Sequence, residues 1–225
     1  MTELSRLANA DLHLRSAYGS QELFESTNGW TQFLRVLLVG PTAEQANDAL
    51  RDVLGTAPLA TPGTTSQATT GQLVELLSGI PRGPQKASLL RAVAEWWLTQ
   101  FGDETSPEWA KGLEFYRESL RKIRGLGPAT VDELLMFVTK LPVFPLDRGT
   151  LRVAIRHGWL DLPVEDDEAQ DFFVRGLREA SIDPREFSRL MSRVAEAHCG
   201  REPKCEGCPL QPLLPLNGPL NPDSC

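Results

Sequence analysis

The chain has 225 residues and a formal net charge of −7, which is enough length for one or two domains with a substantial core. This acidic balance excludes a uniformly basic nucleic-acid binder. No apolar run approaches the ~20 residues that a membrane-spanning helix needs, and the opening MTELSRLANADLHLR contains no apolar signal core. We therefore expect a cytoplasmic protein that contacts no membrane.

Apolar residues recur at spacings of three and four along most of the chain, which predicts amphipathic helices and an all-α fold. The stretch TAPLATPGTTSQATT, residues 56–70, is typical of a surface loop. The helix starts that we expect lie at Thr42, Thr69 or Thr70, Ser106 with Pro107, Asp147, and Asp183 with Pro184. The predicted helices cover residues 29–39, 43–54, 71–80, 86–101, 107–123, 128–141, 147–160, 168–180 and 183–198.

The stretch KIRGLGPATVDELL places two glycines and a proline between two helical patterns. It predicts a first helix that ends at Ile123 or Arg124 and a second helix that begins at Pro128. Gly125 and Gly127 would allow positive φ angles and a close approach of the backbone to another molecule. The result is a helix-hairpin-helix.

The start of the second hairpin helix is a candidate phosphate site, because its free N–H groups and its positive dipole end favour an anion. Thr130 could add a hydroxyl donor, and Lys122 and Arg124 add positive charge. Residues 117–156 carry eight Lys and Arg against four Asp and Glu, so the hairpin lies in a basic part of the chain. The alternative is an ordinary turn between two helices.

All four cysteines fall within the last 27 residues, which argues against a disulfide framework spread through the fold. They indicate one metal or cluster site formed by Cys199, Cys205, Cys208 and Cys225. Four thiolates can hold either tetrahedral zinc or an iron-sulfur cluster, and both remain open at this point.

In their order along the chain, these features resemble the helix-hairpin-helix DNA glycosylases of the endonuclease III family. In that family the hairpin is followed by a catalytic aspartate in a VDTHxxRV-like segment and then by a four-cysteine [4Fe-4S] loop. Here VFPLDRGTLRVAIR follows the hairpin with Asp147, and the cysteines come after it. The resemblance runs from about Trp30 to Cys208 and includes LLSGIPRGPQKASLLRAV, which looks like the helix-loop-helix ahead of the hairpin.

The resemblance implies two helical domains beside a cleft. One is a six-helix barrel with the hairpin at about residues 25–142, and the other is an iron-sulfur cluster domain formed by residues 1–24 and 143–225. Asp147 would lie at the mouth of the cleft, where its carboxylate could stabilise an oxocarbenium-like sugar and orient or deprotonate water. The alternative role for Asp147 is that of a simple helix N-cap.

Three departures from the family pattern change what the resemblance implies. Bifunctional members have a lysine nucleophile where this chain has Ala129, which excludes β-lyase chemistry by that route. The polar segment that fills the space of a flipped base is replaced by LLVGPTAEQ, with Val39, Gly40 and Pro41. The threonine-histidine pair after the aspartate is replaced by Arg148 and Gly149, so we expect an unusual substrate pocket.

The cysteine spacing is C-x5-C-x2-C-x16-C, against C-x6-C-x2-C-x5-C in the family. The matching position and order favour a [4Fe-4S] cluster, with zinc as the alternative, and the long last loop leaves a three-ligand site with Cys225 free as the other possibility. Between the first two cysteines, Arg201 and Lys204 could contact a phosphate or could be solvated surface charges. Arg82, in IPRGPQ, could enter the gap that a flipped base leaves, although exposed loops carry such residues anyway.

These features predict a monomeric DNA glycosylase that flips and excises a damaged or mismatched base from double-stranded DNA by hydrolysis, without AP-lyase activity. The first alternative is a catalytically inactive DNA-binding member of the same fold. A zinc-bearing helical interaction module is a third hypothesis.

Overall fold

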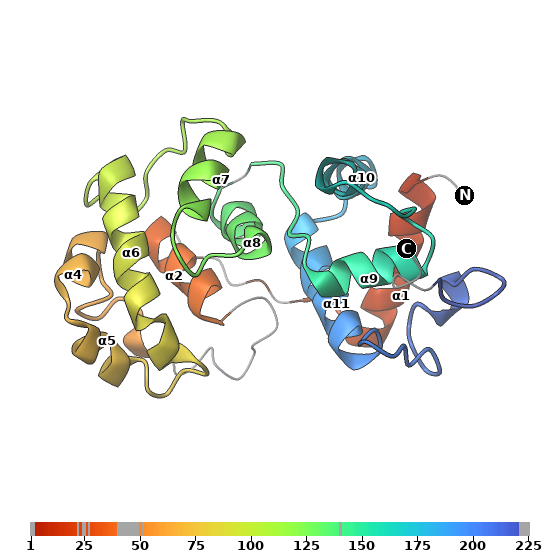
Figure 1. Cartoon of the computed structure of the whole chain (residues 1–225), viewed down its shortest axis with the longest axis horizontal. Helices are drawn as coiled ribbons and strands as arrows, with labels where there is room; N and C mark the ends of the chain where they lie inside the picture. Colours follow the sequence, from red (N-terminus) through yellow and green to blue (C-terminus); the bar gives the residue numbers. More distant parts are fainter. Residues whose placement is uncertain are drawn as a thin grey trace. The chain divides into compact units, whose positions relative to one another are not determined.

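Elements and their bounds come from a computed structural model that describes residues 3–21, 23, 26, 28–39, 50, 52–139 and 141–220. Within these residues the secondary structure consists of ten α-helices and one short 3-10 helix, η1, with no strand (Figure 1), so the all-α prediction is confirmed. The α-helices are α1 (Glu3–Tyr18), α2 (Gly29–Val39), α4 (Pro62–Gln67), α5 (Thr70–Leu76), α6 (Gly83–Phe101), α7 (Leu113–Arg121), α8 (Pro128–Val138), α9 (Arg148–Arg156), α10 (Asp166–Glu179) and α11 (Pro184–Ala197).

None of the described helices is both long enough and apolar enough to cross a membrane.

The helices form two compact units, Phe24–Leu141 and a second unit of Met1–Leu23 with Pro142–Cys225. The first unit has a core of aromatic rings in which α2 packs on α6. Trp30 lies edge-on to Trp97 with centroids 5.2 Å apart, and Phe33 stacks on Trp96 at 6.1 Å. These side chains are almost completely buried, so the apolar stripes of the two helices explain why they pair.

The second unit surrounds a smaller aromatic core. Phe144 stacks on Phe173 of α10 with centroids 4.6 Å apart, and Phe187 of α11 lies 6.2 Å from Phe144. Gly176 of α10 lets α1 approach closely, because a Cβ there would lie 2.6 Å from Leu7 Cδ1. Burial of these apolar groups holds α1, α10 and α11 together.

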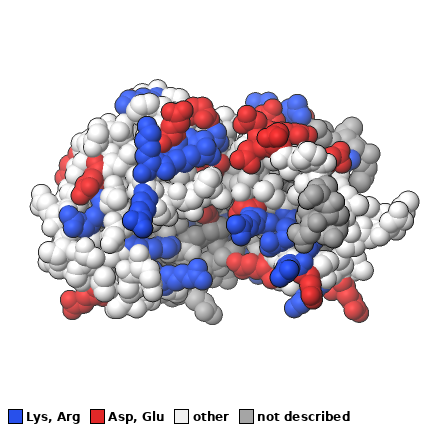
Figure 2. Space-filling view, viewed as in Figure 1, with Lys and Arg blue, Asp and Glu red and all other residues white. Residues whose placement is uncertain are grey.

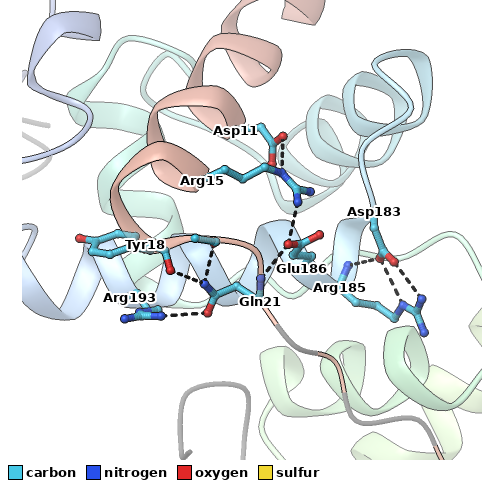
Figure 3. Close-up of polar contacts among 9 residues, drawn as sticks. Asp11, Arg15, Tyr18, Gln21, Asp183, Arg185, Glu186 and Arg193 are labelled. Carbon is cyan, nitrogen blue, oxygen red and sulfur yellow. Dashed lines mark hydrogen bonds and ion pairs between the residues drawn. The ribbon is translucent and has the colours of Figure 1, made fainter.

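Polar contacts also join α1 to α11 in this unit (Figure 3). Arg15 of α1 pairs with Asp11 on its own helix and with Glu186 of α11, at 2.7 and 2.6 Å. Glu186 also accepts from the backbone N–H of Gln21 at 2.7 Å, while Arg193 donates to the Gln21 side chain at 3.1 Å. The network fixes the chain as it leaves α1.

Several predicted helix starts are confirmed by their caps. The side chains of Thr69, Asp147 and Asp183 accept hydrogen bonds from backbone N–H groups in the first turns of α5, α9 and α11. Thr42 lies outside the described residues.

The sequence prediction was wrong for α7, which starts at Leu113 with Gly112 as its N-cap and not at Ser106 with Pro107. The preceding segment is extended because it packs on the start of α2, where Thr105 O accepts from Trp30 N at 2.7 Å. The loop predicted for 56–70 was also wrong in part, because it contains α4. A capping box between Thr61 and Thr64 starts that helix.

Candidate active site and nucleic-acid interface

The hairpin turn between α7 and α8 uses its two glycines differently. Gly125 has a φ of +102°, which favours glycine, whereas Gly127 has a φ of −79°, which any residue adopts. The prediction of positive φ is therefore right for Gly125 and wrong for Gly127. A Cβ on Gly127 would meet nothing within 4 Å, so open space lies beside this glycine. The first helix ends at Arg121, earlier than predicted, because tight turns follow.

Pro128 is confirmed at the start of α8, with Gly127 as the N-cap. Because glycine has no side chain, no capping group covers the first turn, and the N–H groups of Ala129 and Thr130 have no acceptor inside the helix. Thr130 is half-buried in the same turn. The open turn and the positive end of the helix dipole form a surface that can accept an anion.

Positive side chains surround this turn. Arg121, Lys122 and Arg124 are all exposed. Figure 2 shows Lys and Arg side chains gathered over α7 and the turn after it, while Asp and Glu gather over α10 in the other unit. The overall charge of −7 therefore hides a basic surface on the hairpin.

The two hairpin helices are joined by a buried ion pair that the sequence analysis missed. Arg117 Nε of α7 donates to Asp132 Oδ1 of α8 at 2.8 Å, and the two side chains are only 11% and 5% exposed. Arg117 also pairs with Glu114 at the exposed edge of the same helix. Burial raises the pKa of Asp132, and the Arg117 guanidinium opposes this rise.

The loop ahead of α6 presents Arg82 to solvent. This arginine has a φ of 58°, unusual for a residue with a side chain, and it is the N-cap of α6. Gly83 follows because a Cβ there would lie 2.4 Å from Leu77 O. The tight turn leaves Arg82 as an exposed cation at the tip of the loop.

One turn into α6, Lys86 joins this helix to α2. Its Nζ donates to Leu37 O at 2.6 Å and to Leu38 O at 3.0 Å, which caps the carbonyl groups at the end of α2. Burial lowers the pKa of Lys86, although Glu133 opposes the change. No sequence pattern indicated this contact, because it joins residues nearly 50 positions apart.

Asp147 is the N-cap of α9 in the other unit. Its Oδ1 accepts from Thr150 N at 2.6 Å, and within the described residues this is the one hydrogen bond of the Asp147 side chain. Oδ2 is therefore available to another group, and the side chain is half-buried. Gly149 cannot carry a side chain without movement, because its Cβ would lie 2.9 Å from Ala195 Cβ of α11. Close packing of α9 on α11 thus explains why glycine follows Arg148 here.

Cys199, Cys205 and Cys208 are free thiols that line one small cavity of about 10 Å³, which is space for about one water molecule. Burial raises the pKa of the Cys208 thiol, and the neighbouring Cys205 and Cys199 raise it further. A nearby positive charge would favour the thiolate form of Cys208. Cys225 lies outside the described residues.

Arg156 supplies positive charge at this cavity and was not predicted. It is 3% exposed, and its Nη1 donates to Cys199 Sγ at 3.3 Å and to Gly200 O at 2.7 Å. Its Nη2 donates to Arg201 O at 2.7 Å. Within the described part of the chain, no carboxylate forms an ion pair with Arg156, so a thiolate is the anion best placed to balance it.

Three free thiols and a buried guanidinium line one cavity, and thiols of this kind are the side chains that bind zinc or an iron-sulfur cluster. In the described residues, however, no three possible ligands lie close enough together to hold a metal ion. Arg201 and Lys204 lie in the loop between Cys199 and Cys205, and both side chains are exposed. This loop therefore presents positive charge to solvent.

The predicted site residues are divided between the two units. Those of the hairpin, together with Arg82, belong to Phe24–Leu141, whereas Asp147, the cysteines, Arg201 and Lys204 belong to the other unit. Val39 is the last residue of α2. Gly40 and Pro41, which replace the polar segment that fills the space of a flipped base in the family, lie outside the described residues.

No family model matches the chain. Among curated proteins, the candidate DNA repair glycosylase MJ1434 of Methanocaldococcus jannaschii is 24% identical over 127 residues, which are 56% of this chain and 58% of that protein. The aligned region thus spans less than two thirds of this relative.

Solved structures match over nearly the whole chain. A non-covalent endonuclease III–DNA complex aligns with a TM-score of 0.66 and 17% identity, over 95% of both chains. A thermostable thymine-DNA glycosylase aligns with a TM-score of 0.64 and 13% identity, over 94% of this chain and 93% of that one. The 3-methyladenine DNA glycosylase of H. pylori, bound to 1,N6-ethenoadenine, gives 0.59 and 16%, over 87% and 98%. The chain therefore has the fold of the endonuclease III superfamily of helix-hairpin-helix DNA glycosylases, as its motifs predicted.

Proposed function

We propose that this protein is a DNA N-glycosylase that flips a damaged or mismatched base out of double-stranded DNA and removes it by hydrolysis. The observation that carries the proposal is the agreement of its fold with endonuclease III over 95% of both chains. The helix-hairpin-helix and the aspartate at the start of α9 are the local features that support it.

The hairpin would bind the DNA backbone. Its uncapped first turn offers the N–H groups of Ala129 and Thr130 to one phosphate, and the open space beside Gly127 lets that phosphate approach. Lys122 and Arg124 add charge to the contact. Arg201 and Lys204 would bind phosphate in the same sequence-independent way, and Arg82 would enter the gap that the flipped base leaves.

Asp147 would perform the chemistry. While Oδ1 is held by Thr150 N, Oδ2 can face the sugar, where a negative charge stabilises the oxocarbenium-like transition state. The same carboxylate can orient or deprotonate the water that attacks C1′. Without an amine at Ala129, the reaction would stop after base removal and leave the DNA strand intact.

A [4Fe-4S] cluster is the cofactor that we propose for the cysteine cavity, held by Cys199, Cys205 and Cys208 with Cys225 as the fourth ligand. The overall fold matches that of endonuclease III over 95% of both chains, and three free thiols beside the buried Arg156 support an anionic cluster better than they support an apolar core. The cluster would serve to order the loop that carries Arg201 and Lys204. Zinc would give a colourless protein, whereas the cluster absorbs near 400 nm.

The test incubates the purified protein with duplexes that carry oxidised, deaminated, alkylated or mismatched bases, each analysed with and without alkaline work-up. We expect strand breaks only after alkali. Breaks without alkali would contradict monofunctional chemistry, and DNA binding without any base release would favour a non-catalytic member of the fold.

Two substitutions at Asp147 separate catalysis from helix capping. Asp147→Asn keeps an N-cap of similar strength, so it should cause little loss of stability. The rate of base release should nevertheless fall by a factor of about 100 or more. Asp147→Ala should in addition lower the free energy of unfolding by about 1 kcal/mol. Asp183→Asn, at the N-cap of α11, is the matched control and should keep base release.

A further inference from the structure

The ion pair between the hairpin helices lies one helical turn away from the phosphate-binding turn on both sides. Arg117 precedes the end of α7 at Arg121 by four residues, and Asp132 follows the start of α8 at Pro128 by four. The pair therefore crosses between the helices just behind the turn. Any change in its length changes how far apart the two helix ends lie.

Its burial shows that the pair has a structural task and no direct contact with DNA. With exposed fractions of 11% and 5%, neither side chain can reach a phosphate in solvent, and Arg117 is already engaged by Asp132 and Glu114. Burial raises the pKa of Asp132 because the charged carboxyl lies in a poorly solvated site. An ionised Asp132 carboxylate in this site therefore needs the Arg117 guanidinium within hydrogen-bond distance.

A buried ion pair contributes little net stability, because the cost of removing two charges from water offsets much of their attraction, and in some proteins such a pair instead selects one geometry. An apolar pair of similar volume would allow the two helices to slide and separate, whereas the 2.8 Å contact allows one spacing. The turn at Gly125 and Gly127 depends on that spacing.

We propose that Arg117 and Asp132 are positioning residues that fix the spacing of α7 and α8 and thereby hold the N–H groups of the hairpin turn in the geometry that binds a DNA phosphate. This inference rests on the proposed role of the hairpin in DNA binding. It removes Arg117 from the basic surface that its sequence position suggested.

The main test is the double variant Arg117→Met/Asp132→Leu, which removes one positive and one negative charge and so leaves the net charge unchanged. Its affinity for an undamaged duplex is measured over a range of salt concentrations. We expect the affinity to fall about tenfold, since small misplacements of binding groups are costly. The salt dependence should keep its slope, because the phosphate-binding cations are all retained.

Two matched variants identify the cause. Lys122→Gln should weaken binding and also reduce the slope by about one, as expected for a lost phosphate contact. Arg121→Met, at an exposed position on the same helix, tests whether any cation of α7 has the same effect. Arg117→Gln/Asp132→Asn removes both charges but can keep a neutral hydrogen bond between the two helices, so it should retain more affinity than the apolar pair. If this folded variant loses as much affinity as the apolar pair, or if it binds no better where the apolar pair does not fold, the inference is contradicted.

The outcomes are distinct. Weaker binding with an unchanged slope, in a variant whose urea unfolding stays cooperative, supports the inference. If the double variant binds DNA as well as the wild type does, the inference is overturned. It is also overturned if the double variant and Arg121→Met show the same reduced slope of affinity against salt, because the lost cation alone would then explain the effect. If the wild type itself binds no DNA, the proposed function fails, which the wild-type titration shows before any variant is compared.

Discussion

Arg156 Nη1 donates to the sulfur of Cys199 at 3.3 Å, and both residues are buried. The same guanidinium holds Gly200 O and Arg201 O, while Arg152 Nε donates to Cys199 O at 3.0 Å. The start of the cysteine loop is therefore oriented by two arginines of α9, the helix that begins with Asp147. Helix α9, which has Asp147 as its N-cap, therefore also holds Cys199 through two of its arginine side chains.

If the proposed iron-sulfur cluster is bound, we expect Arg156→Met to lower the affinity of the cysteine site for it by about 10- to 100-fold, as loss of an outer hydrogen-bond partner of a metal ligand generally does. Iron per chain and absorbance near 400 nm measure this, independently of any activity. Arg148→Met, an exposed change on the same helix, should leave both readings as in the wild type. Equal iron content in the two variants would show that the contact with Cys199 has no part in holding the cluster.

Substitution by alanine should lower the stability of the protein at Gly125 and leave it almost unchanged at Gly127. Gly125→Ala forces a side chain into a φ of +102°, so it should lower the free energy of unfolding by about 1 kcal/mol or more. Gly127→Ala has ordinary backbone angles and open space, so its stability should stay within about 0.5 kcal/mol of the wild type.

The Gly127→Ala variant, which keeps its stability, should instead lose affinity for DNA. The Cβ of Gly127→Ala occupies the space through which a phosphate would approach, so binding to duplex DNA should weaken although the fold is intact. Urea unfolding and a duplex titration on the same samples provide both readings. A stable Gly127→Ala that binds like the wild type would show that no ligand comes close to this position.

Local signals made the hairpin and most of the helices predictable, although α1 and α4 were not among the predicted helices. Pro128 after a glycine and Asp147 before an amphipathic pattern mark helix starts through contacts within one turn. The start of α7 was missed because Ser106 and Pro107 also resemble a start, and a contact with the distant Trp30 decides otherwise. In the same way Arg156 and Asp132 meet partners 43 and 15 residues away, at spacings that no periodicity reveals.

Asp183 should make the stability of its unit depend on acid. Burial alone would raise its pKa, but the Arg185 guanidinium and backbone N–H groups outweigh burial and lower the pKa below the ordinary value of 3.8. A carboxyl with a lowered pKa in the folded state stabilises the fold above its unfolded value, and this contribution is lost as the pH falls through the folded pKa.

Asp183→Asn should therefore be less stable than the wild type near about pH 7, and the difference should shrink by about pH 2, where the wild-type carboxyl is protonated too. Urea unfolding at several pH values measures it. Asp166→Asn, at an exposed position in the first turn of α10, is the control. A stability difference that stays constant down to the lowest pH would mean that the ionised form of Asp183 has no advantage over an uncharged cap.

Replacement of Lys86 should lower the free energy of unfolding more than replacement of an exposed lysine does. Its ammonium caps Leu37 O and Leu38 O at the end of α2, and removal of a charged donor from such carbonyl groups costs about 2 kcal/mol. Lys86→Met keeps the stem and removes the donor, so the free energy of unfolding should fall by about this amount. Lys86→Arg should restore part of it, because a guanidinium can still donate to both carbonyl oxygens. Lys122→Met, at an exposed position of the same unit, should change stability by less than about 0.5 kcal/mol, and a similar loss in both lysine variants would assign no special role to the α2 cap.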